Sequence, residues 1–346
     1  MKKKVTMKNI AEALNLSINA VSLAINNKNG VGNETRNRII NVAEEMGYFD
    51  GHKKYGRVVA NKNICILIKT QYFRNSNFYA RVLLGVEKEA RKDGYDVLIN
   101  FDKELLEVPD CVKSGRVCGI ISIGCISDEY LVDLKRYGIP IVMVDNDSMK
   151  EPIDCVVSDN KLGSYKITNL LIKRGYKKIG FFGDLDYSMS IKERFFGYCQ
   201  AIGSLPNIRN YFSECSYALR YSVLKDIEKS IIKHDTPKLI TKVNQLEQIP
   251  EAFVCSNDEA AIQLIYALNK LNYRVPEDIV VTGFDNAALF DADIPKFATV
   301  NVRKEFMGQV AVRKLLWRKD HADEPFENIV LSVEVINGDS IKFARG

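Results

Sequence analysis

The sequence predicts two parts of different fold class, a small all-α head at the N-terminus and a larger α/β core behind it. Three observations support this division. The 346 residues are too many for one core, the first 62 carry apolar residues at helical spacing, and from Asn63 onward short apolar runs alternate with amphipathic stretches. The longest apolar runs are shorter than the ~20 residues that a membrane-spanning helix needs, so no membrane partner is expected.

The excess positive charge is confined to the head. Residues 1–62 contain eleven Lys and Arg against five Asp and Glu, whereas residues 63–346 contain 38 against 39. A compact basic module on a neutral body indicates a polyanion, such as nucleic acid, as the partner of the module alone. The alternative is a solvated basic tail.

The head is expected to hold three short helices. Thr6 and Ser17 can cap the first two by accepting backbone N–H groups, and Asn15 suits the left-handed turn between them. A third helix is expected at 34–46, where Gly47 ends it. The apolar residues that would form the shared core of the first two helices are Ile10, Ala11, Leu14 and Leu16, and then Val21, Ala24 and Ile25. This arrangement is a helix-turn-helix.

In a helix-turn-helix the second helix enters the major groove of DNA with its N-terminal residues toward the bases. The residues that face away from the core here are Ile18, Asn19, Ser22 and Leu23, with Asn26 beyond them. Asn19 can make a paired contact to adenine, and Ile18 can touch a thymine methyl group. Thr6, Ser17, Ser22 and Tyr48 suit phosphate contacts. The alternative is an ordinary helical hairpin whose Ser and Asn are a cap and a surface residue.

The core is expected to contain parallel sheets, because strand and helix patterns alternate along it. The expected strands are 64–68, 95–99, 117–123, 139–144, 153–158, 178–182, 252–256 and 278–284, with a last strand at 329–336. The expected helices lie near 78–92, 127–136, 159–174, 190–202, 217–233 and 257–271. About 280 residues exceed one comfortable core, so two such sheets are predicted.

Ligands of such folds bind beyond the carboxyl ends of the strands. The residues that follow strands or open the next helix, and that carry suitable groups, are Phe78, Tyr79, Asp145, Arg194, Asn257 and Asp285. Carboxylates, an amide and a guanidinium beside an aromatic ring can hold a polyol, with the polar groups on its hydroxyls and the ring on its C–H face. Taken singly, Asn257 also suits a helix cap, Asp285 a turn, and Arg194 a surface position.

The remaining chemistry-bearing residues indicate neither a metal site nor an enzyme. The eight cysteines form no CxxC pair, and none of His52, His234 and His321 lies near another candidate ligand. The usual signatures of nucleotide-binding loops, nucleophile elbows and zinc proteases are absent. We therefore expect no catalytic residues and no cofactor. No secretion signal is recognisable, and buried reduced thiols are typical of a cytoplasmic protein.

The segments TMKNIAEALNLSINAVSLAIN and GVGNETRNRIINVAEEMGY resemble the DNA-binding head of the lac repressor (LacI/GalR) family of bacterial transcription regulators. The resemblance adds Thr35 and Arg36 to the expected DNA contacts, and it places Arg57 where the family has a Leu that wedges into the minor groove. Leu23 stands where a basic residue is common, so the base preference of relatives does not transfer.

The resemblance continues through the core. Arg194 before Gly197, Asn257 in Ser-Asn-Asp, and Asp285 in Gly-Phe-Asp match effector-contacting positions of the family, as does Asp145. Val302 stands where the family commonly has Gln, which implies an effector different from the common galactosides.

The resemblance implies a core of two Rossmann-like subdomains of the periplasmic sugar-binding-protein type, with chain crossings near 158–160, 286–302 and 325–332. The expected parts are a DNA-binding head (1–48), a hinge (49–62) and a core (63–346) for effector binding and dimerisation. Subdomain one is expected to span about 63–158 plus 302–328, and subdomain two about 159–301 plus 329–346.

The implied function is that of a homodimeric regulator, more often a repressor in this family, which binds a pseudo-palindromic site on double-stranded DNA under control of a sugar-like effector. The resemblance leaves activation of transcription as an alternative to repression. The main alternative is a solute-binding protein without a DNA role, against which the basic head argues, and an enzyme acting in the cleft ranks below it.

Overall fold

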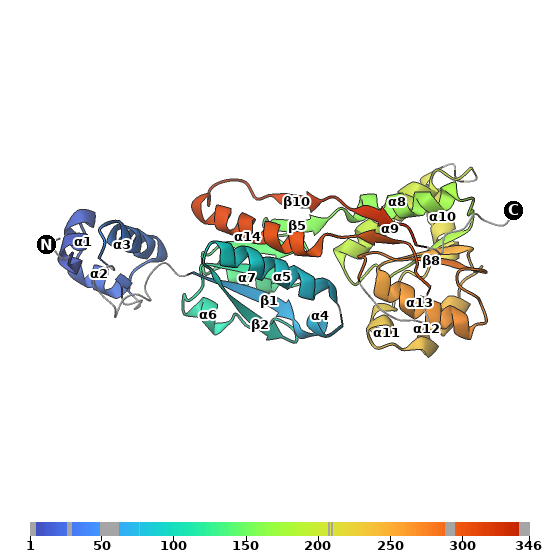
Figure 1. The fold of residues 1–346 in the computed structure, drawn as a ribbon, viewed down its shortest axis with the longest axis horizontal. Helices are drawn as coiled ribbons and strands as arrows, with labels where there is room; N and C mark the ends of the chain where they lie inside the picture. The colour runs from blue at the N-terminus through green and yellow to red at the C-terminus, as the bar shows by residue number, and fades with distance from the viewer. Residues whose placement is uncertain are drawn as a thin grey trace.

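The computed structural model describes residues 5–25, 30–48, 62–75, 77–206, 208, 210–287 and 295–338. Figure 1 shows a helical head at one end, followed by two α/β subdomains in a row. Asn26, Arg57 and almost all of the expected hinge lie outside the described residues, as do positions 1–4 and 339–346. Within the described part of the chain, no helix has the length and apolar character needed to cross a membrane.

The head is the predicted three-helix unit. Its helices are α1 (Met7–Leu14), α2 (Ile18–Ile25) and α3 (Asn33–Glu45). The Asn9 N–H donates to the Thr6 hydroxyl at 3.4 Å, and the Ala20 N–H donates to the Ser17 hydroxyl at 3.1 Å, which confirms both predicted caps. Asn15, at φ 53°, makes the left-handed turn between α1 and α2. The apolar residues of the three helices close one small core, which includes Ile10, Val21, Ala24, Ile39 and Ala43.

Subdomain one is built on a six-stranded parallel sheet in the order β10-β5-β4-β3-β1-β2. The strands are β1 (Asn63–Lys69), β2 (Asp96–Asp102), β3 (Gly119–Ile123), β4 (Ile141–Val144), β5 (Asp154–Ser158) and β10 (Asn328–Leu331). The helices are α4 (Thr70–Asn75), α5 (Asn77–Lys92), α6 (Asp110–Lys113), α7 (Asp128–Lys135) and α14 (Lys304–Asp320). Alternate residues of β1 face opposite sides of the sheet, so Ile64 and Ile66 pack with α5 and α14, and Cys65 and Leu67 with α6 and α7.

Helices α5 and α14 cross with their backbones almost in contact. A Cβ atom on Gly85 would lie 1.9 Å from the Glu305 carbonyl oxygen, and one on Gly308 would lie 2.2 Å from the Val82 carbonyl oxygen. Real Cβ atoms do not approach other atoms so closely, so only glycine fits at the two positions. This crossing fixes α14 against the sheet of subdomain one.

Subdomain two has a three-stranded parallel sheet in the order β6-β7-β8 and a two-stranded antiparallel pair, β9 and β11. The strands are β6 (Ile179–Phe182), β7 (Ala252–Cys255), β8 (Val280–Thr282), β9 (Thr299–Asn301) and β11 (Glu334–Ile336). The helices are α8 (Asn160–Lys173), α9 (Met189–Ile202), α10 (Tyr211–Tyr221), α11 (Glu228–Ile232), α12 (Thr236–Asn244) and α13 (Asp258–Lys270). The Asp285 N–H donates to the Val300 carbonyl at 2.8 Å, which joins β9 to the edge of the parallel sheet.

The strands near the C-terminus differ from the prediction. The expected single strand at 329–336 is two strands, and β10 pairs with β5 of subdomain one. The expected limit at 328 was therefore wrong, because the sheet of subdomain one includes residues up to Leu331. The physical reason is that β5 would otherwise leave backbone groups unpaired, and β10 satisfies them. The chain then crosses at Ser332–Val333, where the buried Val333 side chain packs beside Gly163 of α8.

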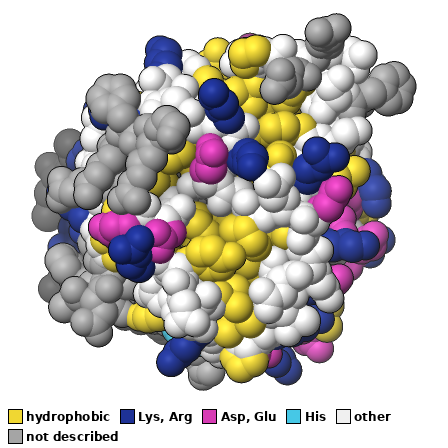
Figure 2. Space-filling view, turned by 90° about the vertical axis from the view of Figure 1, so that its right-hand side faces the viewer, with side chains coloured by type: hydrophobic (Ala, Val, Ile, Leu, Met, Phe, Trp, Pro, Cys, Tyr) yellow, Lys and Arg dark blue, Asp and Glu magenta, His cyan; other side chains and the backbone are white. Residues whose placement is uncertain are grey.

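The expected helix at 217–233 is two helices, α10 and α11. Between them Val223 runs beside β6, where its N–H donates to the Phe181 carbonyl at 2.9 Å and its carbonyl accepts from the Gly183 N–H at 3.0 Å. An extended segment at the sheet edge thus interrupts the helical pattern. Figure 2 shows the end of the molecule formed by subdomain two, where apolar side chains gather among Lys and Arg.

Candidate functional site

The exposed start of α2 is the first candidate site. Ser17, Ile18 and Asn19 are exposed, with Ile18 at 51%, although isoleucine is usually buried. Ser22 and Leu23 lie one turn further on and are half-buried. Thr6, at the start of α1, is also exposed. A helix end that presents an amide, a hydroxyl and a branched apolar side chain to solvent has the groups needed to contact base edges and phosphates.

Two of the other described residues expected to contact DNA, Arg36 and Tyr48, have structural partners inside the head. An Arg36 Nη1 group donates to the carbonyl oxygens of Leu23 at 3.4 Å and Ala24 at 3.3 Å, so Arg36 holds the C-terminal end of α2 against α3. Tyr48 is only 5% exposed and packs in the head core, which leaves little of its side chain for a phosphate. Thr35, on α3, is half-buried.

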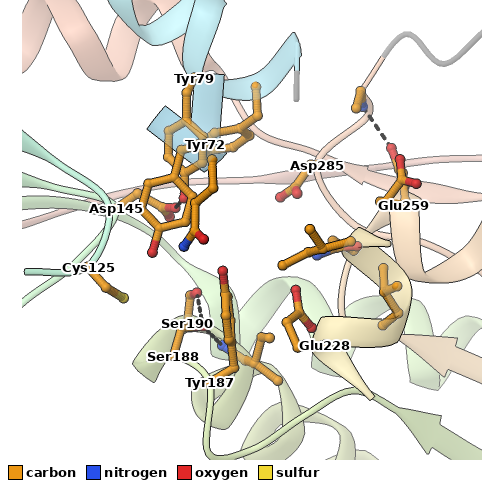
Figure 3. A pocket seen from close by; sticks show the side chains of 18 of the residues that line it. Tyr72, Tyr79, Cys125, Asp145, Tyr187, Ser188, Ser190, Glu228, Glu259 and Asp285 are labelled. Atoms are coloured by element: carbon orange, nitrogen blue, oxygen red, sulfur yellow. Dashed lines mark hydrogen bonds between the residues drawn. The ribbon is translucent and has the colours of Figure 1, made fainter. Parts of the chain in front are cut away.

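The second candidate site is a cavity of about 130 Å³ between the two subdomains (Figure 3). The structure brings together all six residues that the sequence suggested for a ligand, namely Phe78, Tyr79, Asp145, Arg194, Asn257 and Asp285. Subdomain one contributes α4, the start of α5 and the loops after β3 and β4. Subdomain two contributes α9, α11, the start of α13 and the loops after β6 and β8.

Asp145 is held at the end of β4 in a left-handed conformation, with φ 58°. The Tyr79 hydroxyl donates to its Oδ2 at 3.0 Å, while its buried Oδ1 has no hydrogen-bond partner within the described part of the chain. The pKa of Asp145 is raised to about 7, chiefly by burial and also by Asp285, while Arg194 and Tyr79 oppose the shift. This carboxyl group can accept a hydrogen bond from a ligand.

Arg194, on α9, is 4% exposed and engaged on several sides. Its Nε donates to Asn160 Oδ1 at 2.9 Å, Nη1 donates to the Ser256 carbonyl at 2.6 Å, and Nη2 lies 3.1 Å from Asp285 Oδ1. The guanidinium also stacks on the Phe284 ring, 3.8 Å from its centroid. These contacts fix its plane, so Arg194 is both a structural link and a wall of the cavity.

Asn257 and Asp285 lie at strand ends of subdomain two. Asn257 caps α13, because its Oδ1 accepts the Ala260 N–H at 2.7 Å, so the expected cap role is present. Asp285 has φ 100°, which is unusual for a residue other than glycine. Its carboxylate pairs with Arg194, and its backbone N–H joins β9.

One wall of the cavity is aromatic. The rings of Phe78 and Tyr79 lie 5.0 Å apart, and so do those of Tyr72 and Tyr79. Phe78 itself is almost fully buried in the core beneath this wall. Figure 3 shows Tyr72 across the cavity from Asp285 and Glu228, and Tyr187 beside Glu228. Aromatic faces next to polar side chains are the usual surroundings of a bound sugar ring or amine.

Comparison with known proteins relates the whole chain to one family. Residues 6–49 match the profile of bacterial regulatory proteins of the lacI family, residues 61–215 that of periplasmic binding proteins and the sugar-binding domain of the LacI family, and residues 168–341 that of the periplasmic binding protein-like domain. The chain belongs to the LacI/GalR family.

Relatives of similar length support this assignment. The chain is 25% identical to the transcriptional repressor PurR of Mannheimia succiniciproducens and 26% identical to the ribose operon repressor of Haemophilus influenzae, in each case over 97% of this chain and 98% of the relative.

Solved structures agree in fold, at 19% identity. A complex of the transcriptional regulator CelR with cellobiose has a TM-score of 0.65, covering 97% of this chain and 100% of the other. The lac repressor dimer bound to operator and the anti-inducer ONPF has a TM-score of 0.62, covering 98% and 99%.

This LacI/GalR chain is thus a transcriptional regulator, with a DNA-binding head and an effector-binding core. The family consists of regulators rather than enzymes. Within the described residues, no group of three or more His, Cys, Asp or Glu side chains is arranged to hold a metal ion.

The cavity of this LacI/GalR regulator has further lining residues that the sequence did not suggest as ligand contacts. They include Tyr72, Cys125, Tyr187, Ser188, Ser190, Glu228, His234 and Glu259. Cys125 follows β3, so the strand end could have suggested it. Glu228 begins the short helix α11, inside a range expected to be one continuous helix, and the sequence has no signal for it.

Asp258 is part of the framework of the cavity. Its Oδ1 accepts the Thr299 hydroxyl at 2.5 Å, and its Oδ2 accepts the Ala287 N–H at 2.7 Å. Burial and the neighbouring Asp285 raise the pKa of Asp258 to about 8, against the effect of these hydrogen bonds. Both oxygens are occupied by the protein, so Asp258 ties α13 to the segment that leads to β9.

Proposed function

We propose that this protein is a homodimeric cytoplasmic repressor whose affinity for its operator is controlled by a polyhydroxylated small molecule bound between the two subdomains. One observation carries the proposal: six residues chosen for the chemistry of polyol binding come from both subdomains and line one cavity. A ligand in this cavity contacts both subdomains, so its binding changes the free-energy difference between the open and the closed arrangement of the core.

The head reads DNA with the start of α2. Asn19 contacts an adenine and Ile18 a thymine methyl group in the major groove, while Thr6, Ser17 and Ser22 bind phosphates. Thr35 remains a candidate phosphate contact at the start of α3. Asn26 and Arg57 extend the contact surface in this proposal, although both lie outside the described residues. Two heads related by a two-fold axis match a pseudo-palindromic site on double-stranded DNA.

The core binds the effector by its hydroxyl groups. Asp145 and Asp285 accept hydrogen bonds from hydroxyls, Arg194 and Asn257 complete the polar wall, and Tyr79 with Phe78 forms the apolar face. The names of relatives support a sugar-like molecule, since one is a ribose operon repressor and two solved regulators contain cellobiose or ribose.

Three chain crossings link the subdomains and transmit their movement. They lie at Ser158–Asp159, between β9 and α14, and at Ser332–Val333. The buried Lys304 ammonium stands at the middle crossing and donates to the carbonyls of Asp285, Asn286 and Val302. Rotation about these crossings shifts subdomain one, to which the head is joined, relative to its copy in the dimer.

A mobility-shift titration tests the regulator. The full-length protein is mixed with the DNA upstream of its own operon at physiological salt, with bulk DNA as competitor. We expect one duplex with an inverted repeat to bind at least a thousandfold more tightly than bulk DNA. If no duplex competes better than bulk DNA, the proposal is wrong.

Conservative substitutions test the effector site. D145N and D285N keep the size of the side chain and are expected to abolish the effect of the effector on operator binding, while the operator affinity without effector changes less than threefold. The matched control D133N removes an exposed carboxylate of α7 and should leave the response intact. Arg194 is not suited to this test, because its removal also breaks the contacts to Asn160 and Ser256. Retained response in both cavity variants would exclude the site.

A further inference from the structure

Glu228 is a buried carboxylate that faces the cavity without a complete set of partners. It begins α11, is only 6% exposed, and lines the cavity opposite the aromatic wall (Figure 3). Its Oε2 atom is buried and has no hydrogen-bond partner among the residues that the structure describes. A buried carboxylate oxygen without a donor is costly unless a ligand supplies one.

More acidic than basic side chains line the cavity. Five carboxyl groups line it, against one guanidinium and one imidazole, and they belong to Asp145, Glu228, Asp258, Glu259 and Asp285. The Lys304 ammonium lies beneath Asp285 and offsets part of this excess, but it is directed at three backbone carbonyls. With these carboxyl groups ionised, the cavity therefore favours a ligand that brings positive charge.

The basic side chains that line the cavity already have partners. Arg194 is held by Asn160, the Ser256 carbonyl and Asp285. His234 lies at the exposed rim, with its Nε2 3.2 Å from Glu259 Oε1. Below Glu228, the Asp184 carboxylate adds a further negative charge, and its Oδ2 accepts the backbone N–H groups of Ile227 and Glu228 at 3.1 and 3.3 Å. Within the described residues, no ammonium or guanidinium is hydrogen-bonded to Glu228.

We propose that the effector is a cationic amino sugar or amino polyol, and that Glu228 binds its ammonium group while Asp145 and Asp285 accept its hydroxyls. This inference rests on the proposed function, since it specifies the ligand of the same cavity. An ammonium at this point pairs with the carboxylate that has no donor, and it lies beside the Tyr187 ring, which lines the same cavity next to Glu228 (Figure 3).

The raised pKa of Glu228 agrees with recognition of a cation. The pKa of Glu228 is raised to about 7, chiefly by burial and also by Asp184 and Glu259, while Arg194 opposes the shift. A bound ammonium favours the ionised carboxylate and offsets this shift. A neutral sugar leaves Glu228 either protonated or ionised without a counter-charge, and a sugar phosphate adds negative charge to a cavity that already has an excess.

Matched pairs of sugars test the charge directly. Glucose, galactose and ribose are compared with their amino-deoxy analogues, with the amine at each available carbon, by calorimetric titration of the full-length protein at pH 7. We expect at least one amino sugar to bind tenfold or more tightly than its hydroxyl counterpart, and its N-acetyl derivative to lose that gain. Equal or tighter binding of every neutral counterpart overturns the inference.

Two variants test whether Glu228 recognises the ammonium group of the ligand. E228Q keeps the size of the side chain and is expected to reduce the preference for the amine at least tenfold. E247Q, the matched control, removes an exposed carboxylate outside the cavity and should change it less than threefold. If E228Q does not fold, E228D serves instead; it retains the charge with a shorter reach and should keep a preference for amines at reduced affinity. Unchanged preference in E228Q, or in E228D an unchanged affinity, overturns the assignment.

The outcomes distinguish this inference from the proposed function. Binding of a neutral sugar that weakens operator binding, without binding of any amine, rejects the cationic effector and retains the sugar-controlled repressor. If none of the probes binds, the amino-sugar effector is also rejected. Specific operator binding by the unliganded protein is measured in a separate experiment. Loss of specific operator binding alone rejects only the regulator proposal.

Discussion

At the scale of single residues, the cavity contains carboxyl groups that remain protonated at a pH where exposed carboxyl groups are ionised. The native pKa is about 7 for Asp145 and Glu228 and about 8 for Asp258, with burial as the largest cause in each case. Between the ordinary and the raised pKa, the native protein holds protons that the unfolded chain has lost. The stability of the ligand-free core therefore falls as pH rises from about 4.5 to about 8, and changes little above that.

We expect the denaturation midpoint of the ligand-free core to fall between pH 5 and pH 8. At about 1.4 kcal/mol per pKa unit, Glu228 alone accounts for about 3 kcal/mol of this loss. E228Q should flatten the slope, whereas E247Q, which changes an exposed carboxylate, should not. The facing groups Asp184, Arg194 and Glu259 are present in both variants. A core whose stability rises through this range would contradict the prediction.

Asn19 and Arg36 are expected to affect DNA binding in different ways. Replacing Asn19 by Ala should remove about 1–3 kcal/mol of discrimination at one base pair, because the exposed amide is lost. Replacing Arg36 by Ala should weaken all operators alike and lower the melting temperature of the head, because α2 loses its link to α3.

The control for these head variants is N41A, which removes an exposed amide of α3. Binding measured against a library of single-base operator variants separates the three cases. If N19A instead loses the same affinity for every operator variant, Asn19 contacts the DNA backbone and not a base.

At the scale of elements, the crossing of α5 and α14 depends on two glycines. G85A and G308A each place a methyl group within about 2 Å of a carbonyl oxygen of the other helix, so the helices must separate. We expect a loss of about 3 kcal/mol or more in stability of the core. The control G138A meets no neighbouring atom but has a left-handed backbone, with φ 64°, and should cost about 1 kcal/mol. Equal losses in a urea titration would show that the crossing is not tight.

The same elements show how far the sequence could be interpreted. Buried strands such as β3 and β7 are short apolar runs between turns, and these were placed correctly. Helix α14 was not predicted, because its buried side includes Lys314 and Arg318, which hide the apolar period. Both pair with the fully buried Asp154, Arg318 through two bonds of 2.6 and 2.9 Å. A cluster of buried charges that joins segments far apart in the sequence produces no hydrophobic periodicity within either segment.

The candidate site was predictable where strand order determines it. Asp145, Asn257 and Asp285 follow parallel strands, and such ends meet at one edge. Glu228 was not predictable, because its position depends on the extended segment at Val223, which only the pairing with β6 defines. The roles of Arg36 and Tyr48 in the core of the head also depend on contacts between helices, which spacing alone does not show.

At the scale of the whole molecule, operator and effector binding are linked through one conformational equilibrium. If the effector lowers operator affinity by a given factor, the operator must lower effector affinity by the same factor. We expect calorimetric titrations of the effector with and without saturating operator to differ by the factor that mobility shifts measure. A sugar that does not bind serves as control. Different factors in the two directions would mean that the two sites are not coupled by equilibrium binding.

The backbone at Asp145 and Asp285 restricts how such a pocket can change during evolution. Both residues have positive φ, a conformation that glycine adopts freely, that aspartate and asparagine adopt more often than other residues, and that branched residues avoid. Few amino-acid substitutions are therefore tolerated at positions 145 and 285. Glu228 lies on an ordinary helical turn and has no such restriction, so gene duplicates that acquire a new inducer should diverge first at α11, and laboratory libraries for altered ligand preference are best randomised there.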